Sequence, residues 1–322
     1  MNISFDAKRA YHNSRGLGNY SRDTIRLFTS FAQKNNYYLI AKPSQRYSFP
    51  NTTTIAPHGI YSNFPAIYRS FGCIDDLKNM DVHWGLSAEL PFGINKLTSL
   101  KKIVTIHDAI FIRYPELYSA TYRHLFKLKV TYSCNVADTI VAISQQTKED
   151  IVNFFNINPN KIEVIYQGCN NIFRQPISEE SNIKIEKYNL PTEFILDVGA
   201  IEPRKNLANL IKAVSISGTN LPIVAVGGAS RYAEQMTTLA AKLNVTLILL
   251  HEFPFELLPA LYKKALVFAY PSIFEGFGIP ILEAMSVGTP VLTSTGSCFA
   301  ETGGEAAIYA NPFSRSTSII FI

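Results

Sequence analysis

A ten-residue segment, Phe274–Glu283 (FEGFGIPILE), combines carboxylates and glycines in a spacing that suits ligand binding. Glu275 and Glu283 lie eight residues apart, with Gly276 and Gly278 between them. Glycines let the backbone approach a ligand because no Cβ intervenes, and a helix that begins behind the loop directs unpaired amides toward an anion. An acidic side chain there can instead accept hydrogen bonds from hydroxyls such as those of a ribose. The plainer interpretations are a solvated loop carboxylate at Glu275 and a helix-dipole interaction at Glu283.

A second segment, Val198–Asn206 (VGAIEPRKN), places two adjacent cations where a predicted strand gives way to a helix. Arg204 offers a planar guanidinium fork and Lys205 a point charge, and both groups bind phosphate. The helix dipole disfavours cations at a helix start. Their position therefore favours a bound anion, with a solvated basic pair as the alternative. Asn206 is the expected N-cap of the helix.

Two further candidate segments lie nearer the N-terminus. In Arg15–Tyr20 (RGLGNY), Gly16 and Gly18 form a loop that enters a helix and can hold phosphate or leave space for a sugar, although many ordinary turns share this pattern. In Thr105–Glu116 (TIHDAIFIRYPE), His107 ends a predicted strand. An imidazole in that position can hydrogen-bond a sugar hydroxyl, and a purely structural role is the alternative.

The elements that must position these residues alternate along the chain. The predicted strands are 2–6, 37–41, 81–86, 102–106, 139–143, 194–198, 223–226, 245–250, 267–270 and 291–293, and the predicted helices are about 19–33, 119–136, 144–155, 207–216, 231–243, 256–265 and 280–287. This alternation predicts an α/β fold with parallel sheets covered on both faces. A polar segment, Gly168–Pro191, is expected to link two doubly wound domains, residues 1–176 and 177–322. Ligands of such sheets bind at the carboxyl ends of the strands.

Composition narrows the class of protein. The 322 residues are 47% hydrophobic and 17% charged, which excludes a disordered chain. No apolar segment approaches the ~18 residues that cross a bilayer, and the first residues lack a signal-peptide core, so a cytoplasmic location is expected. The four cysteines (Cys73, Cys134, Cys169 and Cys298) are too scattered for a zinc motif or a disulfide framework and are expected to be buried.

Charge is distributed unevenly along the chain. Residues 1–176 hold 20 Lys and Arg against 12 Asp and Glu, whereas residues 177–322 hold 10 against 13. A basic first half can face an anionic lipid, a membrane surface or a phosphate-bearing acceptor, and a merely basic, solvated surface is the alternative. No dense Lys/Arg stripe or nucleic-acid motif occurs, so nucleic acid is not an expected partner.

Several motifs that carry other kinds of chemistry are absent from the sequence. Without a D-x-D triplet, a metal–diphosphate site of that kind is not indicated. Without a P-loop, an NTPase is disfavoured, and without a G-x-S-x-G elbow, so is an α/β-hydrolase. The Gly16-Leu17-Gly18 loop also lacks the third glycine of the dinucleotide fingerprint.

Taken together, these segments resemble the retaining glycosyltransferases of family 4, and most of all bacterial mannosyltransferase-like members of cell-surface polysaccharide pathways such as lipopolysaccharide synthesis. The resemblance runs from Phe5 to about Pro312 and also includes AISQQTKEDI, VIYQGCN and CFAETGGEAAIYANP. It implies the GT-B fold, two Rossmann-like domains that face each other across a cleft. The C-terminal domain would bind a nucleotide sugar, GDP-mannose or a UDP-hexose, and the N-terminal domain a glycan or lipid-linked acceptor. No metal or other cofactor is expected.

The resemblance also implies roles for individual side chains. Arg204 and Lys205 would hold the donor diphosphate. Glu275 would contact hydroxyls of the donor sugar, Glu283 would contact the ribose, and His107 would meet the sugar. Of these, Glu275, His107, Arg204 and Lys205 are the predicted catalytic residues.

Backbone groups complete the expected donor site. The amides of Gly276, Phe277 and Gly278 would lie against the sugar and the phosphate. From the other domain, Gly16 and Gly18 would border the diphosphate.

Two features depart from the family pattern. Ala200 stands where many relatives carry an arginine, which would leave more of the phosphate charge to Arg204 and Lys205. The chain also ends soon after Pro312, where relatives continue with further helices, so the C-terminal domain is expected to be truncated and its apolar end, Ile319–Ile322, to lack a core. Two alternatives to an active transferase therefore stay open: a non-catalytic nucleotide-sugar-binding remnant and a GT-B nucleotide-sugar epimerase. A peripheral position at the inner face of the membrane is compatible with the basic first half.

Overall fold

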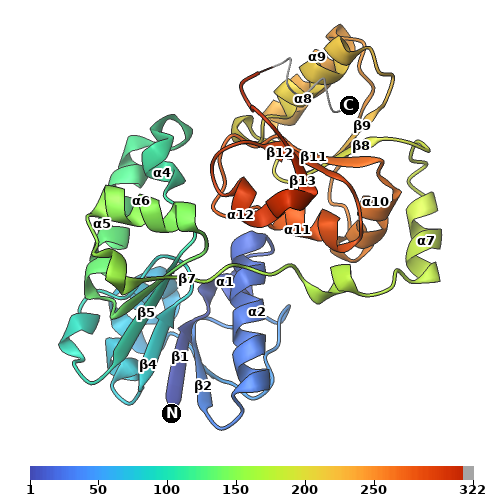
Figure 1. Ribbon diagram of the computed structural model, residues 1–322. Helices are drawn as coiled ribbons and strands as arrows, with labels where there is room; N and C mark the ends of the chain where they lie inside the picture. Colours follow the sequence, from blue (N-terminus) through green and yellow to red (C-terminus); the bar gives the residue numbers. More distant parts are fainter. Residues whose placement is uncertain (315–322) are drawn as a thin grey trace. The chain divides into compact units, whose positions relative to one another are not determined.

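The computed structural model describes residues 1–314. The chain divides into two compact units, Met1–Gln167 and Gly168–Ile322, each with its own sheet (Figure 1). This division falls before the predicted boundary at residues 176 and 177. The expected apolar end at Ile319–Ile322 lies outside the described residues.

The first unit is built on a seven-stranded parallel sheet with the strand order β3-β2-β1-β4-β5-β6-β7. The strands are β1 (Asn2–Asp6), β2 (Asn36–Ile40), β3 (Thr53–Ile55), β4 (Val82–Gly85), β5 (Lys101–Ile106), β6 (Thr139–Ala142) and β7 (Ile162–Val164). The helices are α1 (Lys8–His12), α2 (Gly16–Phe31), α3 (Pro65–Ser70), α4 (Ile110–Arg113), α5 (Ala120–Val136) and α6 (Gln145–Phe155), with 3-10 turns that include η1 (Gly59–Asn63) and η2 (Gly72–Leu77). The strand order reverses between β1 and β4, as in a doubly wound sheet.

The second unit repeats this plan with a six-stranded parallel sheet in the order β10-β9-β8-β11-β12-β13. Its strands are β8 (Ile195–Val198), β9 (Ile223–Val226), β10 (Leu247–Leu250), β11 (Val267–Tyr270), β12 (Val291–Ser294) and β13 (Ala307–Ala310). Its helices are α7 (Glu179–Glu186), α8 (Leu207–Ser217), α9 (Arg231–Lys242), α10 (Leu258–Lys264), α11 (Ile279–Ser286) and α12 (Phe299–Gly303), and 3-10 turns include η6 (Asn171–Arg174) and η7 (Pro203–Lys205). Here the order reverses between β8 and β11.

Both strand orders confirm the predicted α/β fold with two doubly wound parallel sheets. Every strand predicted from the sequence is present within a residue or two of its expected bounds. The three strands that the sequence did not indicate, β3, β7 and β13, are edge strands of three or four residues. Such short segments show no usable periodicity.

The prediction of a linker over Gly168–Pro191 is wrong. This segment belongs to the second unit and contains η6 and α7. Phe173 of η6 and Ile185 of α7 are each 1% exposed in the core of that unit. These two side chains, with partly buried apolar neighbours in the same segment, anchor a segment whose composition is otherwise polar.

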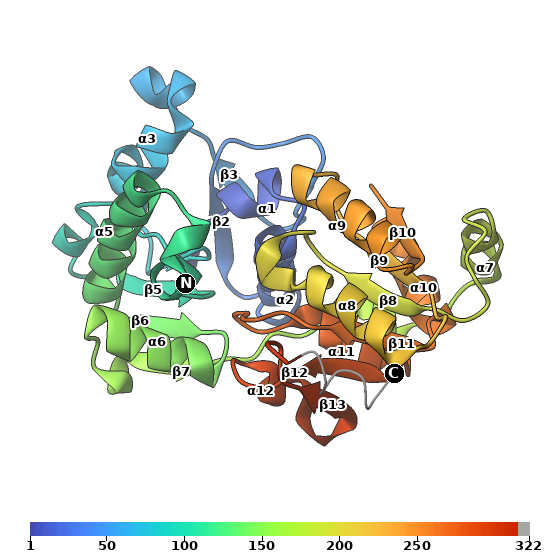
Figure 2. The ribbon, with the colours of Figure 1, turned by 90° about the horizontal axis from the view of Figure 1, so that it is seen from above.

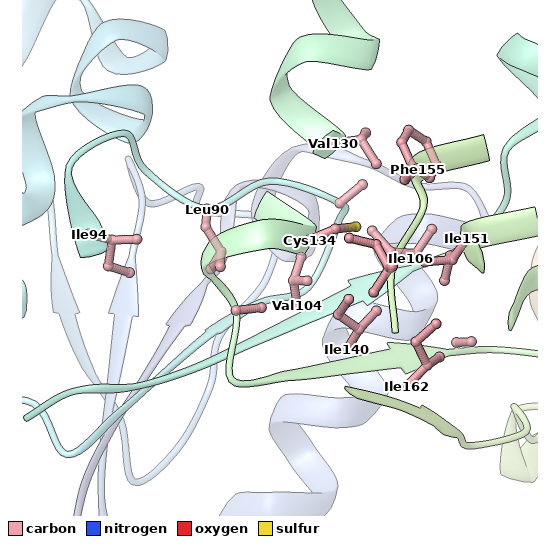
Figure 3. Packing of buried hydrophobic residues seen from close by; sticks show 14 of the residues in the cluster. Leu90, Ile94, Val104, Ile106, Val130, Cys134, Ile140, Ile151, Phe155 and Ile162 are labelled. Atoms are coloured by element: carbon pink, nitrogen blue, oxygen red, sulfur yellow. The ribbon is translucent and has the colours of Figure 1, made fainter. Parts of the chain in front are cut away.

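Each unit has its own hydrophobic core. In the first unit, apolar side chains of β5 and β6 pack against apolar side chains of α5 and α6 (Figure 3). The strands contribute Val104, Ile106 and Ile140, and the helices contribute Val130, Cys134, Ile151 and Phe155. A core in the second unit packs around Phe194, Phe268 and Ile281. Cys73, Cys134 and Cys298 are buried as predicted, and Cys169 is partly buried.

Candidate active site

The second sheet brings two of the predicted segments to one edge. Val198 ends β8 and Tyr270 ends β11, and these strands are neighbours at the point where the strand order reverses. Arg204 and Lys205 follow β8, and Glu275 follows β11. Ligands of open parallel sheets bind at this reversal point, beyond the carboxyl ends of the strands.

Arg204, Lys205 and Glu275 are in direct contact. Nη1 of Arg204 and Nζ of Lys205 each lie 2.7 Å from the same atom, Oε1 of Glu275. The other arm of Arg204 pairs with Glu202, with 2.6 Å between Nη2 and Oε1. The side chains of Arg204 and Lys205 are 13% exposed and that of Glu275 is 12% exposed. Two cations therefore share one nearly buried carboxylate, and the half-exposed Glu202 adds a second negative charge beside Arg204.

The contacts keep this carboxylate charged. Burial alone would raise the pKa of Glu275, but Lys205 and Arg204 outweigh burial, and the pKa lies below its ordinary value. Burial disfavours the charged form of Arg204 too, yet Glu275 and Glu202 hold the pKa of the guanidinium above its ordinary value. Glu275 and Arg204 are thus both ionised at neutral pH.

Lys205 also interacts with one residue from each of the two central strands, β11 and β8. Its Nζ donates a hydrogen bond of 2.7 Å to the hydroxyl of Tyr270 and lies 4.8 Å from the centre of that ring. Asp197, a buried residue of β8, interacts electrostatically with Lys205 and Glu275. Burial raises the pKa of Asp197 to about 7, with Lys205 opposing the rise and Glu275 adding to it.

The glycine-rich loop is tied to the segment after β12. The Ser297 hydroxyl accepts a hydrogen bond from the amide of Glu275 at 3.2 Å and donates to the Glu275 carbonyl at 3.0 Å. The Cys298 thiol donates to the carbonyl of Phe277 at 3.0 Å. These bonds hold the backbone of the loop in one conformation.

The loop residues Gly276, Phe277 and Gly278 are all buried within the unit. Gly278 has φ of +98°, a conformation that favours glycine, and forms the N-cap of α11. The predicted contact of these amides with a sugar and a phosphate stays a prediction.

Glu283 has a different partner from Glu275. It is the fifth residue of α11, which begins one residue before the predicted start at residue 280, so it lies beyond the first turn. The hydroxyl of Tyr262, on α10, donates to its Oε2 at 2.9 Å, and both residues are buried. Burial raises the pKa of Glu283 to about 7, although the hydrogen bond from Tyr262 opposes the rise. The predicted contact with a ribose stays a prediction.

The two glycines of the first unit lie in a helix and not in the loop that was predicted. α2 begins at Gly16, so Gly16 and Gly18 occupy its first turn. A Cβ on Gly18 would lie 1.7 Å from the carbonyl oxygen of Asn13, whereas a Cβ on Gly16 would meet nothing within 4 Å. Packing therefore accounts for Gly18, while Gly16 leaves open space at the helix N-terminus.

His107 follows β5, as predicted, and both of its ring nitrogens have partners. Nε2 lies 2.9 Å from the carbonyl oxygen of Leu86, which can only accept, so the proton is on Nε2. Nδ1 accepts a bond of 3.4 Å from the side-chain amide of Gln167. Burial lowers the pKa of His107 to about 4, with the Leu86 bond opposing the shift and Arg9 adding to it. The ring is therefore neutral at pH 7, and its contact with a sugar stays a prediction.

Charged residues occupy the reversal point of the first sheet as well. Arg69 lies 2.5 Å from Oδ2 of Asp6, which ends β1, and 2.8 Å from Oε2 of Glu89, which follows β4. Lys129 pairs with the same oxygen of Glu89 at 3.0 Å. Two cations and two carboxylates thus form a network whose charges balance.

Several residues of the site were missed in the sequence. Tyr270 was included only as the end of a strand, although its position beside Pro271 at a strand end places it on the ligand-binding edge. Asp197 stands inside the apolar strand ILDV, and a charged residue in a buried strand is itself a signal for function. Ser297 carries no such signal, because its contact with Glu275 depends on how two distant loops fold.

Residues 1–314 contain neither a cluster of metal-ligating side chains nor a membrane-spanning helix. No group of three or more His, Cys, Asp and Glu side chains in that part of the chain could hold a metal ion. None of its helices is both long and apolar enough to cross a bilayer.

Two family models match successive parts of the chain. The model described as Glycosyltransferase Family 4 matches residues 46–171, and the model described as Glycosyl transferases group 1 matches residues 178–308. The chain belongs to glycosyltransferase family 4. The resemblance that the sequence motifs indicated is thereby confirmed.

Curated relatives of this family 4 glycosyltransferase include mannosyltransferases. The chain is 33% identical over 211 residues to the O-antigen chain mannosyltransferase RfbU of Salmonella typhimurium. The aligned region covers 65% of this chain and 56% of that relative. It is 28% identical over 219 residues to the O-antigen chain mannosyltransferase B of Escherichia coli, which covers 66% of this chain and 58% of the relative. The chain therefore spans less than two thirds of the length of these relatives.

Solved structures share the fold of this family 4 glycosyltransferase. Sucrose-phosphate synthase from Thermosynechococcus elongatus matches with a TM-score of 0.76 at 18% identity, covering 99% of this chain and 88% of that one. WaaG, a glycosyltransferase involved in lipopolysaccharide biosynthesis, matches with a TM-score of 0.72 at 16% identity, covering 99% and 89%. Anabaena HepE in complex with UDP-glucose matches with a TM-score of 0.74 at 17% identity, covering 99% and 88%. Both units thus have the GT-B arrangement of strands and helices.

Proposed function

We propose that the chain is a retaining glycosyltransferase that moves a hexose, with mannose as the first sugar to test, from a nucleotide diphosphate sugar to a glycan or lipid-linked acceptor in cell-surface polysaccharide biosynthesis. Family membership and the mannosyltransferase relatives support this proposal. The complex of HepE with UDP-glucose supports a nucleotide sugar as the donor class.

The observation that carries the proposal is the contact of Arg204 and Lys205 with Glu275 at the strand reversal of the second sheet. Two cations held 2.7 Å from one oxygen can also hold a diphosphate, whose oxygens carry at least as much charge as a carboxylate. A diphosphate that binds both cations competes with Glu275 for them. The carboxylate of Glu275 is then available to accept hydrogen bonds from hydroxyls of the sugar.

In the proposed reaction the bond between the anomeric carbon and the diphosphate oxygen breaks, through a transition state that resembles an oxocarbenium ion. Negative charge grows on the departing diphosphate, and Arg204 and Lys205 stabilise it. Preorganised groups of this kind contribute ~3–4 kcal/mol each to the lowering of a barrier. The acceptor oxygen forms its bond to the anomeric carbon on the face that the diphosphate leaves, and the leaving phosphate takes the proton of that hydroxyl, so the anomeric configuration is retained.

Substitution of Lys205 tests this role. With saturating donor, Lys205→Ala is expected to lower turnover by about 10²-fold or more. Lys242→Ala, at the exposed end of α9 in the same unit, is the matched control. Turnover of Lys205→Ala equal to that of the control contradicts the proposed phosphate role.

Product analysis separates glycosyl transfer from other activities on the same fold. A transferase releases nucleoside diphosphate only with transfer to an acceptor, whereas an epimerase converts the donor alone. Conversion of the donor sugar without an acceptor contradicts the proposal, and so does binding of the donor without turnover for any acceptor tested.

We propose that the reaction needs no metal, because Arg204 and Lys205 supply the positive charge that a metal would otherwise bring to the diphosphate. Activity is expected to be unchanged in excess chelator. Loss of activity in chelator, restored by Mg²⁺ or Mn²⁺, contradicts this part of the proposal.

A further inference from the structure

Asp197 is a carboxylate that is buried within the second sheet. Its strand, β8, lies between β9 and β11, and Figure 2 shows these strands beside helix α8. The side chain shares a face of the sheet with Ile195, two residues before it, and its neighbours on that face are the alanines Ala225 and Ala269. Asp197 is 5% exposed. A titratable group therefore stands in a layer that is otherwise apolar.

The carboxylate of Asp197 has no hydrogen-bond donor and no ion pair within residues 1–314. The groups that act on it do so at longer range: Lys205 of η7, Glu275 of the glycine-rich loop, and the hydroxyls of Tyr262 on α10 and Tyr270 on β11. Strand β9 (IVAV) and the first turn of α8 (LANL) bring no charged side chain. Burial without a partner disfavours the charged form of a carboxylate. A carboxylate kept at this cost beside a ligand-binding edge indicates a functional role.

Lys205 connects Asp197 with the proposed diphosphate site. A Cβ on Gly199, two residues after Asp197, would lie 3.7 Å from Nζ of Lys205, so the ammonium group lies over the end of β8. The positive charge of Lys205 is the one that favours the ionised form of Asp197. A diphosphate that binds Lys205 neutralises this charge. The ionised carboxylate then loses its counter-charge.

The charges of the site point the same way. Arg204 and Lys205 are already balanced by Glu275 and Glu202. A diphosphate with an ester at each end carries a negative charge on each phosphate, and it lacks the ionisation near pH 6 that a phosphate monoester has. An ionised Asp197 would add one more negative charge to a site that the donor has made anionic. Binding of a proton at Asp197 removes that charge.

We propose that Asp197 takes up a proton when the nucleotide sugar binds, and that it is a positioning residue that acts on the diphosphate through Lys205. This inference rests on the proposed function and extends it to the pH dependence of donor affinity. The proton comes from the solvent and adds to a carboxylate oxygen, and no bond of the donor changes.

The direction of the pH dependence follows from the charge of Asp197 before the donor binds. Burial raises the pKa of Asp197 to about 7. At pH 6 the carboxyl group is therefore mostly protonated, and the donor binds without taking up a proton. At pH 8 it is mostly ionised, so the donor must either bind beside a negative charge or bring in a proton. Donor affinity is expected to fall as the pH rises.

Isothermal titration of the full chain with GDP-mannose, or with the UDP-hexose that binds, tests this inference. Titrations at pH 7.5 in HEPES and in Tris, whose ionisation enthalpies differ, count the protons taken up. Wild type is expected to take up about half a proton for each donor bound at this pH, and its donor affinity is expected to fall about fivefold from pH 6 to pH 8. This measurement on wild type does not depend on how any variant folds.

Two variants and a matched control assign the proton. Asp197→Asn keeps the size of the side chain and removes its charge. It is expected to take up none of this proton, to match wild type at pH 6 and to bind the donor about fivefold more tightly than wild type at pH 8. Asp197→Ala, which matches the two neighbouring alanines, has the same expectation. Glu234→Gln removes an exposed carboxylate from α9 in the same unit and is expected to behave as wild type does.

Three results overturn the inference. Donor binding to wild type without proton uptake, or with equal affinity at pH 6 and pH 8, contradicts it and leaves the proposed function standing. Proton uptake that persists in both Asp197 variants assigns the proton to another group of the site, such as Glu275 or Glu283. A chain that binds none of these donors contradicts the proposed function and this inference together.

Discussion

Tyr270 shows how a single side chain determines where the charges of the site lie. Its hydroxyl accepts from Nζ of Lys205 at 2.7 Å, and Lys205 in turn lies 2.7 Å from Glu275. Without that hydroxyl the ammonium group has one fixed partner fewer and can swing away from the strand edge. Tyr270 is therefore a positioning residue, because its contact is with Lys205.

The variant Tyr270→Phe is expected to lower kcat about tenfold or more while the protein stays folded, since a hydrogen bond to a charged group contributes ~1.5–3 kcal/mol. The remaining ring preserves the packing of β11. Tyr232→Phe, on α9, removes a hydroxyl from the same unit and should leave kcat as in wild type. Equal kcat for Tyr270→Phe and wild type shows that the hydroxyl does not position Lys205, and a fall confined to melting temperature points to a structural role alone.

Glu283 makes the stability of the second unit depend on pH. Its pKa is about 7 in the folded protein and near the ordinary 4.5 when unfolded, so the folded state binds the proton more tightly. The contribution of Glu283 to the free energy of unfolding is complete below pH 4.5, and it falls by about 3 kcal/mol as the pH rises to 7. Glu283→Gln removes this fall but keeps an oxygen for Tyr262, so the variant should gain stability over wild type at pH 8 and not at pH 4.

The melting temperature of wild type and Glu283→Gln, measured from pH 4 to 8, checks this dependence. Asp197, whose pKa is also about 7, lowers the free energy of unfolding in the same direction as the pH rises, and it does so in both proteins. Parallel curves for the two proteins would mean that Glu283 ionises in the folded state as readily as in water.

The sequence predicts the residue types of the site better than their contacts. Glycine spacing and paired cations were enough to single out Arg204, Lys205 and Glu275, because the chemistry of phosphate binding restricts side-chain type. That Glu275 would pair with both cations was not predictable, since the pairing depends on two loops separated by about 70 residues meeting at one strand edge. The partner of Glu283, on a different helix, was not predictable for the same reason.

At the scale of elements, helix starts show where local rules suffice. The helix predicted over 144–155 begins with Ser144 as the N-cap of α6, and the Ser144 hydroxyl accepts from the amide of Thr147 at 3.0 Å. Asn206 occupies the N-cap position of α8, yet its side chain does not cap the helix. Its amide donates instead to the carbonyls of Pro271 and Pro312, at 3.1 and 2.8 Å. Tertiary contacts have here replaced the local cap.

Helix α2 offers a paired test of why its first turn contains two glycines. Gly18→Ala places a Cβ 1.7 Å from the Asn13 carbonyl oxygen, so the backbone must shift, at a cost of about 1–3 kcal/mol. Gly16→Ala meets open space and should leave stability unchanged or raise it by up to about 1 kcal/mol. Urea unfolding of both variants gives the comparison, and equal destabilisation would mean that the clash at Gly18 is relieved without cost.

The central strands were predictable because buried parallel strands consist of continuous apolar residues bounded by turn signals. The elements that escaped prediction are edge strands and short helices whose few apolar residues are separated by polar ones. Helix α7 is the clearest case, since Ile185 alone places it in the core.

At the scale of the whole molecule, the two units are expected to unfold as separate cooperative units, because each has a sheet and hydrophobic cores of its own. Ile140→Ala in the first unit and Ile223→Ala in the second each leave a cavity at a fully buried position, which costs about 2–5 kcal/mol. Calorimetry should show two transitions, with each variant lowering only that of its own unit. A single transition lowered equally by both variants would mean that the units unfold together.

The central claim is that Arg204 and Lys205 form the binding site for the diphosphate of a nucleotide sugar. Isothermal titration of the full chain with GDP-mannose and with UDP-hexoses, in the presence of chelator, tests this claim without requiring an acceptor. One of these donors is expected to bind wild type and Lys242→Ala with the same affinity. The same donor is expected to bind the combined variant Arg204→Ala, Lys205→Ala at least tenfold more weakly, because each lost charge-assisted contact costs ~1.5–3 kcal/mol. Donor binding that is equally tight in all three proteins would contradict the account.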